Sequence, residues 1–217
     1  MKKITIAVVL ALASIGAQAN VGNTITGLNN TGAGFAAHAQ DTNYVLTIGS
    51  GPATNGYVAA NNSWPVGPWM VNNATSSWLT PALDQSTSFD PLSNGIYTWA
   101  TTFDLTGYNA ATAGFTGRFA ADNSAVAYLN GHQIGTSSGF TAWSNFSTTA
   151  SDFISGVNTV TFVVTNLKQN GGNPTGLRAE FLTSNVSPVP EPETYGMMLM
   201  GLGLMGFVAR RRKNKQA

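Results

Sequence analysis

Residues 96–105 read IYTWATTFDL, and this stretch decides the fold of the chain. Alternate residues of an extended chain point to opposite faces, so one face of this stretch carries Tyr97, Trp99, Thr101, Phe103 and Leu105. Large side chains on one face and small or polar ones on the other predict a half-buried β-strand.

The same period-two pattern recurs on both sides of this stretch. Residues 157–166, VNTVTFVVTN, place Val160, Phe162 and Val164 on one face. Residues 177–182 (LRAEFL) and 44–48 (YVLTI) are also expected to be strands.

Residues 117–135, GRFAADNSAVAYLNGHQIG, predict two strands and the start of a third. Asp122-Asn123 suits the first turn. Asn130-Gly131 suits a tight two-residue hairpin, because both residues tolerate positive φ.

Between residues 20 and 186 no stretch has sustained helical spacing, and residues 49–94 look mostly irregular, with five prolines. Short strands separated by Gly, Asn and Pro turns favour a sandwich or a jelly roll. We therefore expect an all-β fold: a single antiparallel β-sandwich over residues 20–186, flanked by an N-terminal signal helix and a C-terminal hydrophobic helix.

The N-terminus has the layout of a secretory signal peptide. Two lysines precede an apolar stretch, and small residues precede a cleavage position between Ala19 and Asn20. Residues 1–19 therefore predict export through the Sec machinery and removal of the leader by signal peptidase.

Residues 20–186 contain three cations and seven anions, a net charge of −4, and the chain contains no cysteine. A nucleic-acid partner requires a basic face to replace phosphate counterions, so no nucleic-acid binding is expected. Without disulfides, the exported domain must rely on burial for its stability.

The C-terminus falls into three parts. Residues 187–194, SPVPEPET, predict an extended Pro-rich linker, and residues 195–209 form an apolar run that would act as a transmembrane segment. At about 1.5 Å per residue this run is shorter than the roughly 30 Å bilayer core, which suits a temporary stay in the inner membrane. Residues 210–217 predict a basic cytoplasmic tail whose stop-transfer cluster is Arg210, Arg211, Arg212 and Lys213.

This order of features, Pro190-Glu191-Pro192, an apolar segment and an Arg-rich end, resembles the PEP-CTERM sorting signal. The resemblance implies recognition by an exosortase that cuts near the Pro-Glu-Pro site. It also implies delivery to the outer surface or extracellular matrix of a Gram-negative bacterium that makes exopolysaccharide.

Residues 57–182, which include PWMVNNATSSWLTP and ADNSAVAYLNG, are similar to a recurring ectodomain of PEP-CTERM proteins. Those domains look like galactose-binding-type jelly rolls. The resemblance implies a fold and leaves the activity open.

No catalytic residues are expected. A glycosidase needs two carboxylates at the scissile bond, but the body has one glutamate, Glu180, beside Arg178, while Asp104 and Asp122 sit where turns recruit Asp. The histidines, His38 and His132, are isolated, and no Gly-x-Ser-x-Gly elbow occurs.

No cofactor or metal site is expected, because two isolated histidines without cysteine do not make an ordinary zinc site. A structural calcium ion stays open as an alternative, with oxygens from Asp41 and Asn43 or from Asp122-Asn123. Formation of turns is the competing explanation for these residues.

Aromatic residues are the remaining signal. Trp99 is expected in the core, whereas four tryptophans lie in predicted loops and are candidates for carbohydrate binding: Trp64, Trp69, Trp78 and Trp143. The alternative is that they close the ends of the sandwich, because their area is costly to leave exposed.

The sequence thus predicts an exported, non-enzymatic surface or matrix protein associated with exopolysaccharide, whose role is weak carbohydrate binding or matrix structure. Two alternatives stay open, a secreted polysaccharide-active enzyme and an adhesin that binds protein partners.

Overall fold

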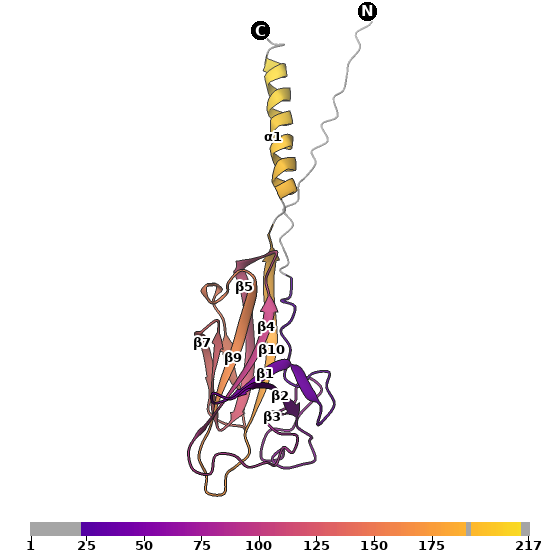
Figure 1. Cartoon of the computed structure of the whole chain (residues 1–217). Helices are drawn as coiled ribbons and strands as arrows, with labels where there is room; N and C mark the ends of the chain where they lie inside the picture. The colour runs from indigo at the N-terminus through magenta and orange to yellow at the C-terminus, as the bar shows by residue number, and fades with distance from the viewer. Residues whose placement is uncertain (1–22, 190–191, 214–217) are drawn as a thin grey trace, which may run out of the picture.

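The computed structural model describes residues 23–189 and 192–213 of the chain (Figure 1). The expected signal peptide, its cleavage position Ala19-Asn20, and residues Pro190 and Glu191 of the sorting motif lie outside the described residues.

The described part of the chain is mostly β. Its strands are β1 (Gln40–Ile48), β2 (Ala53–Val58), β3 (Leu79–Thr80), β4 (Gly95–Asp104), β5 (Tyr108–Asp122), β6 (Ser124–Leu129), β7 (His132–Ser137), β8 (Ser144–Ser147), β9 (Val157–Asn166) and β10 (Gly176–Pro188). A 3-10 turn, η1 (Ala150–Asp152), precedes β9, and the helix α1 (Pro192–Lys213) follows β10.

The strands form one antiparallel sheet in the order β7-β6-β9-β4-β1-β2-β3-β10-β5-β8. The sheet folds over at the short β2–β3 pairing, so β7 to β2 form one layer and β3 to β8 the other. Its two edges, β7 and β8, come into close contact: a Cβ added at Gly135 would lie 2.8 Å from the Phe146 Cβ. The expected all-β, antiparallel sandwich with a C-terminal helix is confirmed.

The alternating strands supply the core between the layers, as their pattern predicts. All five residues of the 96–105 stretch that share a face are buried, four of them in β4 and Leu105 directly after it. Val160, Phe162 and Val164 of β9 are buried as well. Phe162 meets Phe119 of the opposite layer, with ring centroids 5.4 Å apart. Edge-on and tilted aromatic pairs of this kind give the core its contact area without disulfides.

The Asn130-Gly131 hairpin between β6 and β7 is confirmed, with φ values of 51° and 87°. Asp122-Asn123 connects β5 and β6, but these strands belong to different layers and do not pair. The predicted turn is therefore a crossing between the layers.

The outer face of β5 and β10 is also covered, which the alternating pattern of 177–182 did not indicate. Residues 59–78 fold back over it and form a second apolar cluster in which Trp69 and Trp78 pack on Ala120. The two indole rings are 4.6 Å apart. The Pro-rich region 49–94 is mostly irregular, as expected, but it contains β2 and β3, and its residues 59–78 form a packed cover.

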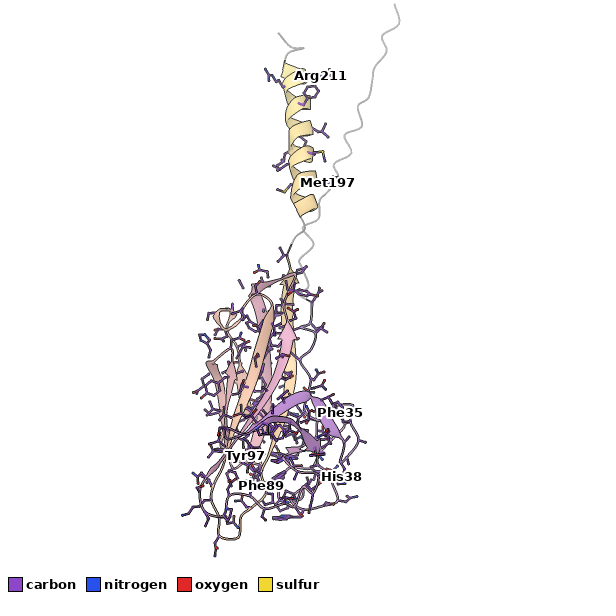
Figure 2. All side chains as sticks on the ribbon, in the orientation of Figure 1. Phe35, His38, Phe89, Tyr97, Met197 and Arg211 are labelled. Atoms are coloured by element: carbon purple, nitrogen blue, oxygen red, sulfur yellow. The ribbon has the colours of Figure 1, made fainter. Side chains whose placement is uncertain are left out.

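The chain enters and leaves the sandwich at the same end, which we call the tail end. Asn23 forms a bridge with Val186, and the Val189 N–H donates to the Gly107 carbonyl. β5 begins here at Tyr108 and finishes at Asp122 at the opposite end, the loop end. A strand of 15 residues separates the two ends by about 45 Å. In Figure 2, Phe89 and Tyr97 lie at the loop end, far from Met197 of α1.

The linker between the sandwich and the helix is shorter than the expected extended segment over 187–194. β10 continues through Pro188, whose partner is Tyr108 of β5, and α1 begins at Pro192. The Pro-Glu-Pro site therefore follows the last strand almost directly.

Gly56 of β2 provides a test of the packing at the fold-over. A Cβ there would lie 2.2 Å from the Trp99 ring, and Trp99 is fully buried in the core. We expect Gly56→Ala to lower the free energy of unfolding by about 1–3 kcal/mol, because overpacking displaces a rigid side chain. Equilibrium urea denaturation measures this change.

Gly114→Ala is the matched control, since its Cβ would meet only the side chain of Asn185 at 3.2 Å. Equal effects of the two substitutions would contradict the described contact between β2 and Trp99.

Candidate functional site

The loop end of the sandwich is hollowed. The hollow has a volume of about 370 Å³, within the range of roughly 300–1,000 Å³ common for small-molecule sites. Five separate segments contribute its lining, and we call it the loop-end hollow. It is lined by Trp64, Pro65, Pro68, Trp69, Ser88, Asp122, Asn123, Phe140, Gln169, Gly172, Asn173 and Pro174.

Asp122 is the one carboxylate in this lining. As the last residue of β5, it is held by its backbone carbonyl, which accepts a 2.6 Å hydrogen bond from the Thr175 hydroxyl. Its Oδ2 accepts a 2.8 Å hydrogen bond from the indole Nε1 of Trp69. Its Oδ1 is buried and has no hydrogen-bond partner within the described chain.

Burial dominates the electrostatics of this carboxylate. Only 6% of Asp122 is exposed. Loss of water raises the pKa of Asp122 to about 6, and the Trp69 hydrogen bond offsets part of that rise. No charged neighbour contributes to the shift, so the negative charge at neutral pH has no cation beside it.

Amide side chains supply the other polar groups of the hollow. Asn123 accepts a hydrogen bond from the Leu167 N–H through its Oδ1, which leaves its Nδ2 without a partner in the described chain. Asn173 donates through its Nδ2 to the Leu167 carbonyl, and the Oδ1 of Asn173 has no partner in the described chain. Backbone hydrogen bonds between Phe89 and Asn173 hold this loop against the neighbouring one. The hollow thus presents both donors and acceptors.

Trp64 supplies the exposed aromatic surface. Its residue is 57% exposed, although indoles are usually covered, and it lines the same hollow as the amides. The following residues are held in place by a hydrogen bond from the Trp69 N–H to the Pro65 carbonyl. An exposed indole beside unused amides is a surface on which an apolar ring face can stack.

The other three candidate tryptophans have different environments. Trp69 and Trp78 are buried, and the Trp78 Nε1 donates to the Met70 carbonyl at 2.7 Å. Both therefore have a packing role, which was the alternative to sugar binding, and neither offers a ring face to solvent. Trp69 still contributes to the hollow, through its wall and its hydrogen bond to Asp122.

Trp143 covers a cluster of charges on the outer face of β5 and β10. The guanidinium groups of Arg118 and Arg178 lie 4.5 and 4.9 Å from its ring centroid. Arg118 is paired with the buried Glu180 at 2.7 Å. The Arg178 Nε donates to the Ser76 hydroxyl, which in turn donates to Glu180. These contacts make Trp143 part of a structural network that fixes the cover.

The residues weighed for catalysis do not gather in one place. Asp104 lies near the tail end, where its Oδ1 accepts hydrogen bonds from the backbone and hydroxyl of Thr106. Both oxygens of Glu180 are engaged, one by Arg118 and the other by Ser76. His132 lies 4.0 Å from Asp152, and His38 takes a positive φ of 68° in a loop. Among the described residues, no three His, Cys, Asp or Glu side chains come together as a metal site.

Of the residues considered for calcium, Asp41 has both oxygens occupied. Its Oδ2 accepts the Gly32 N–H at 2.7 Å and its Oδ1 accepts the Asn43 N–H at 2.9 Å. This is the pattern of an Asx turn. Asp122-Asn123, the other pair, lies in the loop-end hollow.

The loop-end hollow as a whole was not recognised in the sequence. The amide-rich loop LKQNGGNP, residues 167–174, is the signal that could have indicated it, because amides and glycines beside a predicted strand end are common in binding loops. Its partners come from residues 64–69 and 122–123, and only the fold brings these segments together.

The second functional element is the C-terminal helix. The apolar side chains of α1 from Met197 to Phe207 are more than half exposed, and Arg210 and Arg211 follow them. Arg212 and Lys213 complete the last turn of the helix. Within the described residues, no helix meets the length and hydropathy needed to cross a bilayer.

A family model described as the PEP-CTERM protein-sorting motif matches residues 188–213. The chain carries a PEP-CTERM sorting motif. This motif directs export to the cell surface through an exosortase in Gram-negative bacteria. The matched region covers the end of β10, the Pro-Glu-Pro site and all of α1.

The sandwich is also similar to solved structures. The chain is similar to the structure of a family 35 carbohydrate-binding module from an environmental isolate. The two share 12% sequence identity over 49% of this chain and 79% of that chain, with a TM-score of 0.26. No curated protein matches the chain.

The raised pKa of Asp122 predicts a specific pH dependence of stability. Its folded-state pKa of about 6 exceeds the ordinary 3.8, so the group's contribution to stability is fully present below pH 3.8 and is lost as the pH rises through about 6. This contribution amounts to at most about 3 kcal/mol. Asp122→Asn should therefore reduce the gain in stability seen on acidification from pH 7 to pH 4, as measured by urea denaturation across that range.

Asp104→Asn is the control for this experiment. Hydrogen bonds from the Thr106 side chain and backbone lower the pKa of Asp104, so its contribution to stability has the opposite pH dependence. If the Asp122→Asn protein showed the same pH profile as the parent, the described burial of this carboxylate would be wrong.

The sorting motif predicts that Glu191→Ala leaves the protein in the inner membrane fraction and removes it from the cell surface. Glu193→Ala, which keeps the Pro190-Glu191-Pro192 site intact, is the matched control. Fractionation of the native host followed by immunoblotting measures both. Undiminished surface display of Glu191→Ala would contradict the assigned role of the motif.

Proposed function

We propose that this protein is a non-enzymatic, surface-displayed carbohydrate-binding protein that associates with exopolysaccharide through the loop-end hollow. The observation that carries this proposal is the exposed indole of Trp64 in the same hollow as Asn123 and Asn173. The Nδ2 of Asn123 and the Oδ1 of Asn173 have no partner among the described residues. A sugar has the complementary surface, with apolar C–H faces and a rim of hydroxyl groups.

The two kinds of contact have different roles. Stacking of a sugar ring on Trp64 removes apolar area from water, which contributes about 25 cal/mol per Å² of area buried. The amide donors and acceptors then fix the orientation of the ring through its hydroxyls. A single open site with one stacking residue favours weak binding, and many copies on a cell surface raise the overall strength of attachment to a polymer.

The composition of the hollow supports binding without catalysis. Glycosidases use two carboxylates, about 5–9.5 Å apart, on either side of the scissile bond. The lining of the loop-end hollow contains Asp122 alone, with Oδ2 bound to Trp69. Histidine, the usual general base, does not line it either.

The position of the hollow suits a displayed protein. The sorting motif begins where β10 ends, at the tail end, and the hollow lies at the loop end. A sandwich held at its tail end would therefore present the hollow about 45 Å further out.

Trp64→Ala is expected to abolish binding on a glycan array, because it removes the exposed stacking surface. Leu92→Ala is the control: Leu92 is an apolar residue with 86% exposure that is not part of the hollow. The same array samples, assayed for release of reducing ends, test the secreted-enzyme alternative.

Absence of binding by the parent protein to every glycan would overturn the proposal, as would unchanged binding by a folded Trp64→Ala protein. Measurable turnover that is lost in Asp122→Asn would establish the enzyme instead.

A further inference from the structure

We infer that Asp122 sets the charge selectivity of the loop-end hollow, so that it takes uncharged or amine-bearing sugar units and excludes units that carry a carboxylate or sulfate. This inference rests on the proposed function, because it names the class of sugar that the same hollow accepts.

One oxygen of the Asp122 carboxylate has no hydrogen-bond partner among the described residues. The residue is 6% exposed, and its Oδ1 has no partner in the described chain while its Oδ2 is bound to the Trp69 indole. A buried carboxylate oxygen without a donor is unfavourable, because it has lost water without replacement. A ligand group that donates a hydrogen bond, such as a hydroxyl or an ammonium, relieves this deficit. A carboxylate or sulfate has only acceptors and cannot do so.

The charge around the hollow acts in the same direction. No Lys, Arg or His lines it. Of the three cations of residues 20–186, Arg118 and Arg178 lie on the outer face of β5 and β10, where Glu180 engages them. The third, Lys168, precedes the lining residue Gln169 and does not itself line the hollow. No charge near Asp122 shifts its pKa, and residues 20–186 have seven anions against three cations. An anionic sugar would therefore meet the Asp122 carboxylate with no cation in the lining to compensate it, and like charges brought together out of water are strongly unfavourable.

Trp64 extends the preference towards amines. The face of an indole attracts a cation through its electron-rich π system, and tryptophan does so more strongly than tyrosine or phenylalanine. Trp64 and Asp122 line one hollow, so an ammonium group on a stacked sugar would have an aromatic face and a carboxylate close to it. A hydroxyl in the same position would have the carboxylate as its acceptor.

The test compares oligosaccharides that share one β-1,4-linked backbone and differ in charge. They are cellohexaose and the N-acetylglucosamine hexamer as neutral units, the glucosamine hexamer as the amine, and a β-1,4-glucuronan hexamer as the carboxylate. Isothermal titration of the purified full chain at pH 7.5, above the pKa of about 6 for Asp122, gives the dissociation constants. At this pH the carboxylate is ionised. We expect the glucuronan to bind at least about tenfold more weakly than the best neutral or amine hexamer.

Asp122→Asn keeps an oxygen that can accept from the Trp69 indole and removes the charge. The ratio of the glucuronan and glucosamine dissociation constants should fall by about tenfold or more in this variant. Asp104→Asn, which removes a carboxylate near the tail end, should leave the ratio at the parent value.

The outcomes separate this inference from the proposed function. Binding of glucuronan by the parent as tightly as the neutral hexamers overturns the selectivity and leaves carbohydrate binding intact. An unchanged ratio in a folded Asp122→Asn protein also overturns it. If no member of the series or of the glycan array binds the parent, the proposed function fails and this inference fails with it. If the Asp122→Asn protein does not fold, the inference stands or falls with the parent's dissociation constants for the glucuronan and the neutral hexamers.

Discussion

The hydrogen bond from the Trp69 indole to the Asp122 carboxylate, 2.8 Å long, is the contact on which the loop end depends. It joins the Pro-rich segment that covers the sandwich to the last residue of β5, a strand that also pairs with β10 and β8. The indole is itself buried against Trp78. One oxygen of Asp122 is fixed in this way, and the other is a buried acceptor without a partner among the described residues. A single interaction thus closes the outer face and defines the candidate site.

The cover over β5 and β10 explains how an exported domain holds together without disulfides. Its first component is apolar, with Trp69 and Trp78 packed on Ala120. Its second is the network of Arg118, Arg178 and Glu180 beneath Trp143. Breaking a buried pair of this kind leaves an uncompensated charge, so the network is costly to disrupt even though its net stabilisation is small. The Met70 N–H, which donates to the Phe140 carbonyl, ties the two covering segments to each other.

The parts of the fold that follow from local pattern were predictable. The strands at 96–105 and 157–166 alternate large and small side chains, and the face each would bury is evident from that alternation alone. Residues 177–182 show the limit of this reasoning. Their second face, with Arg178 and Glu180, looks like a solvated face, yet it is buried because Ser76 and Val71, more than 100 positions earlier, fold over it. The candidate site was hidden for the same reason. Trp64 and Trp69 are five positions apart in similar sequence, and only the fold exposes one and buries the other.

The sorting motif and the hollow lie at opposite ends of one long pair of strands, β5 and β10. The central proposal is that sugar binds in this hollow, against Trp64. It is tested most directly by the indole ¹H–¹⁵N resonances of the five tryptophans, assigned by substitution and followed while the best-binding oligosaccharide is added. The account predicts that the Trp64 and Trp69 resonances move as the sugar saturates the protein, while those of Trp99 and Trp78 stay in place. Saturation without movement of Trp64, or a change confined to Trp143, would contradict it.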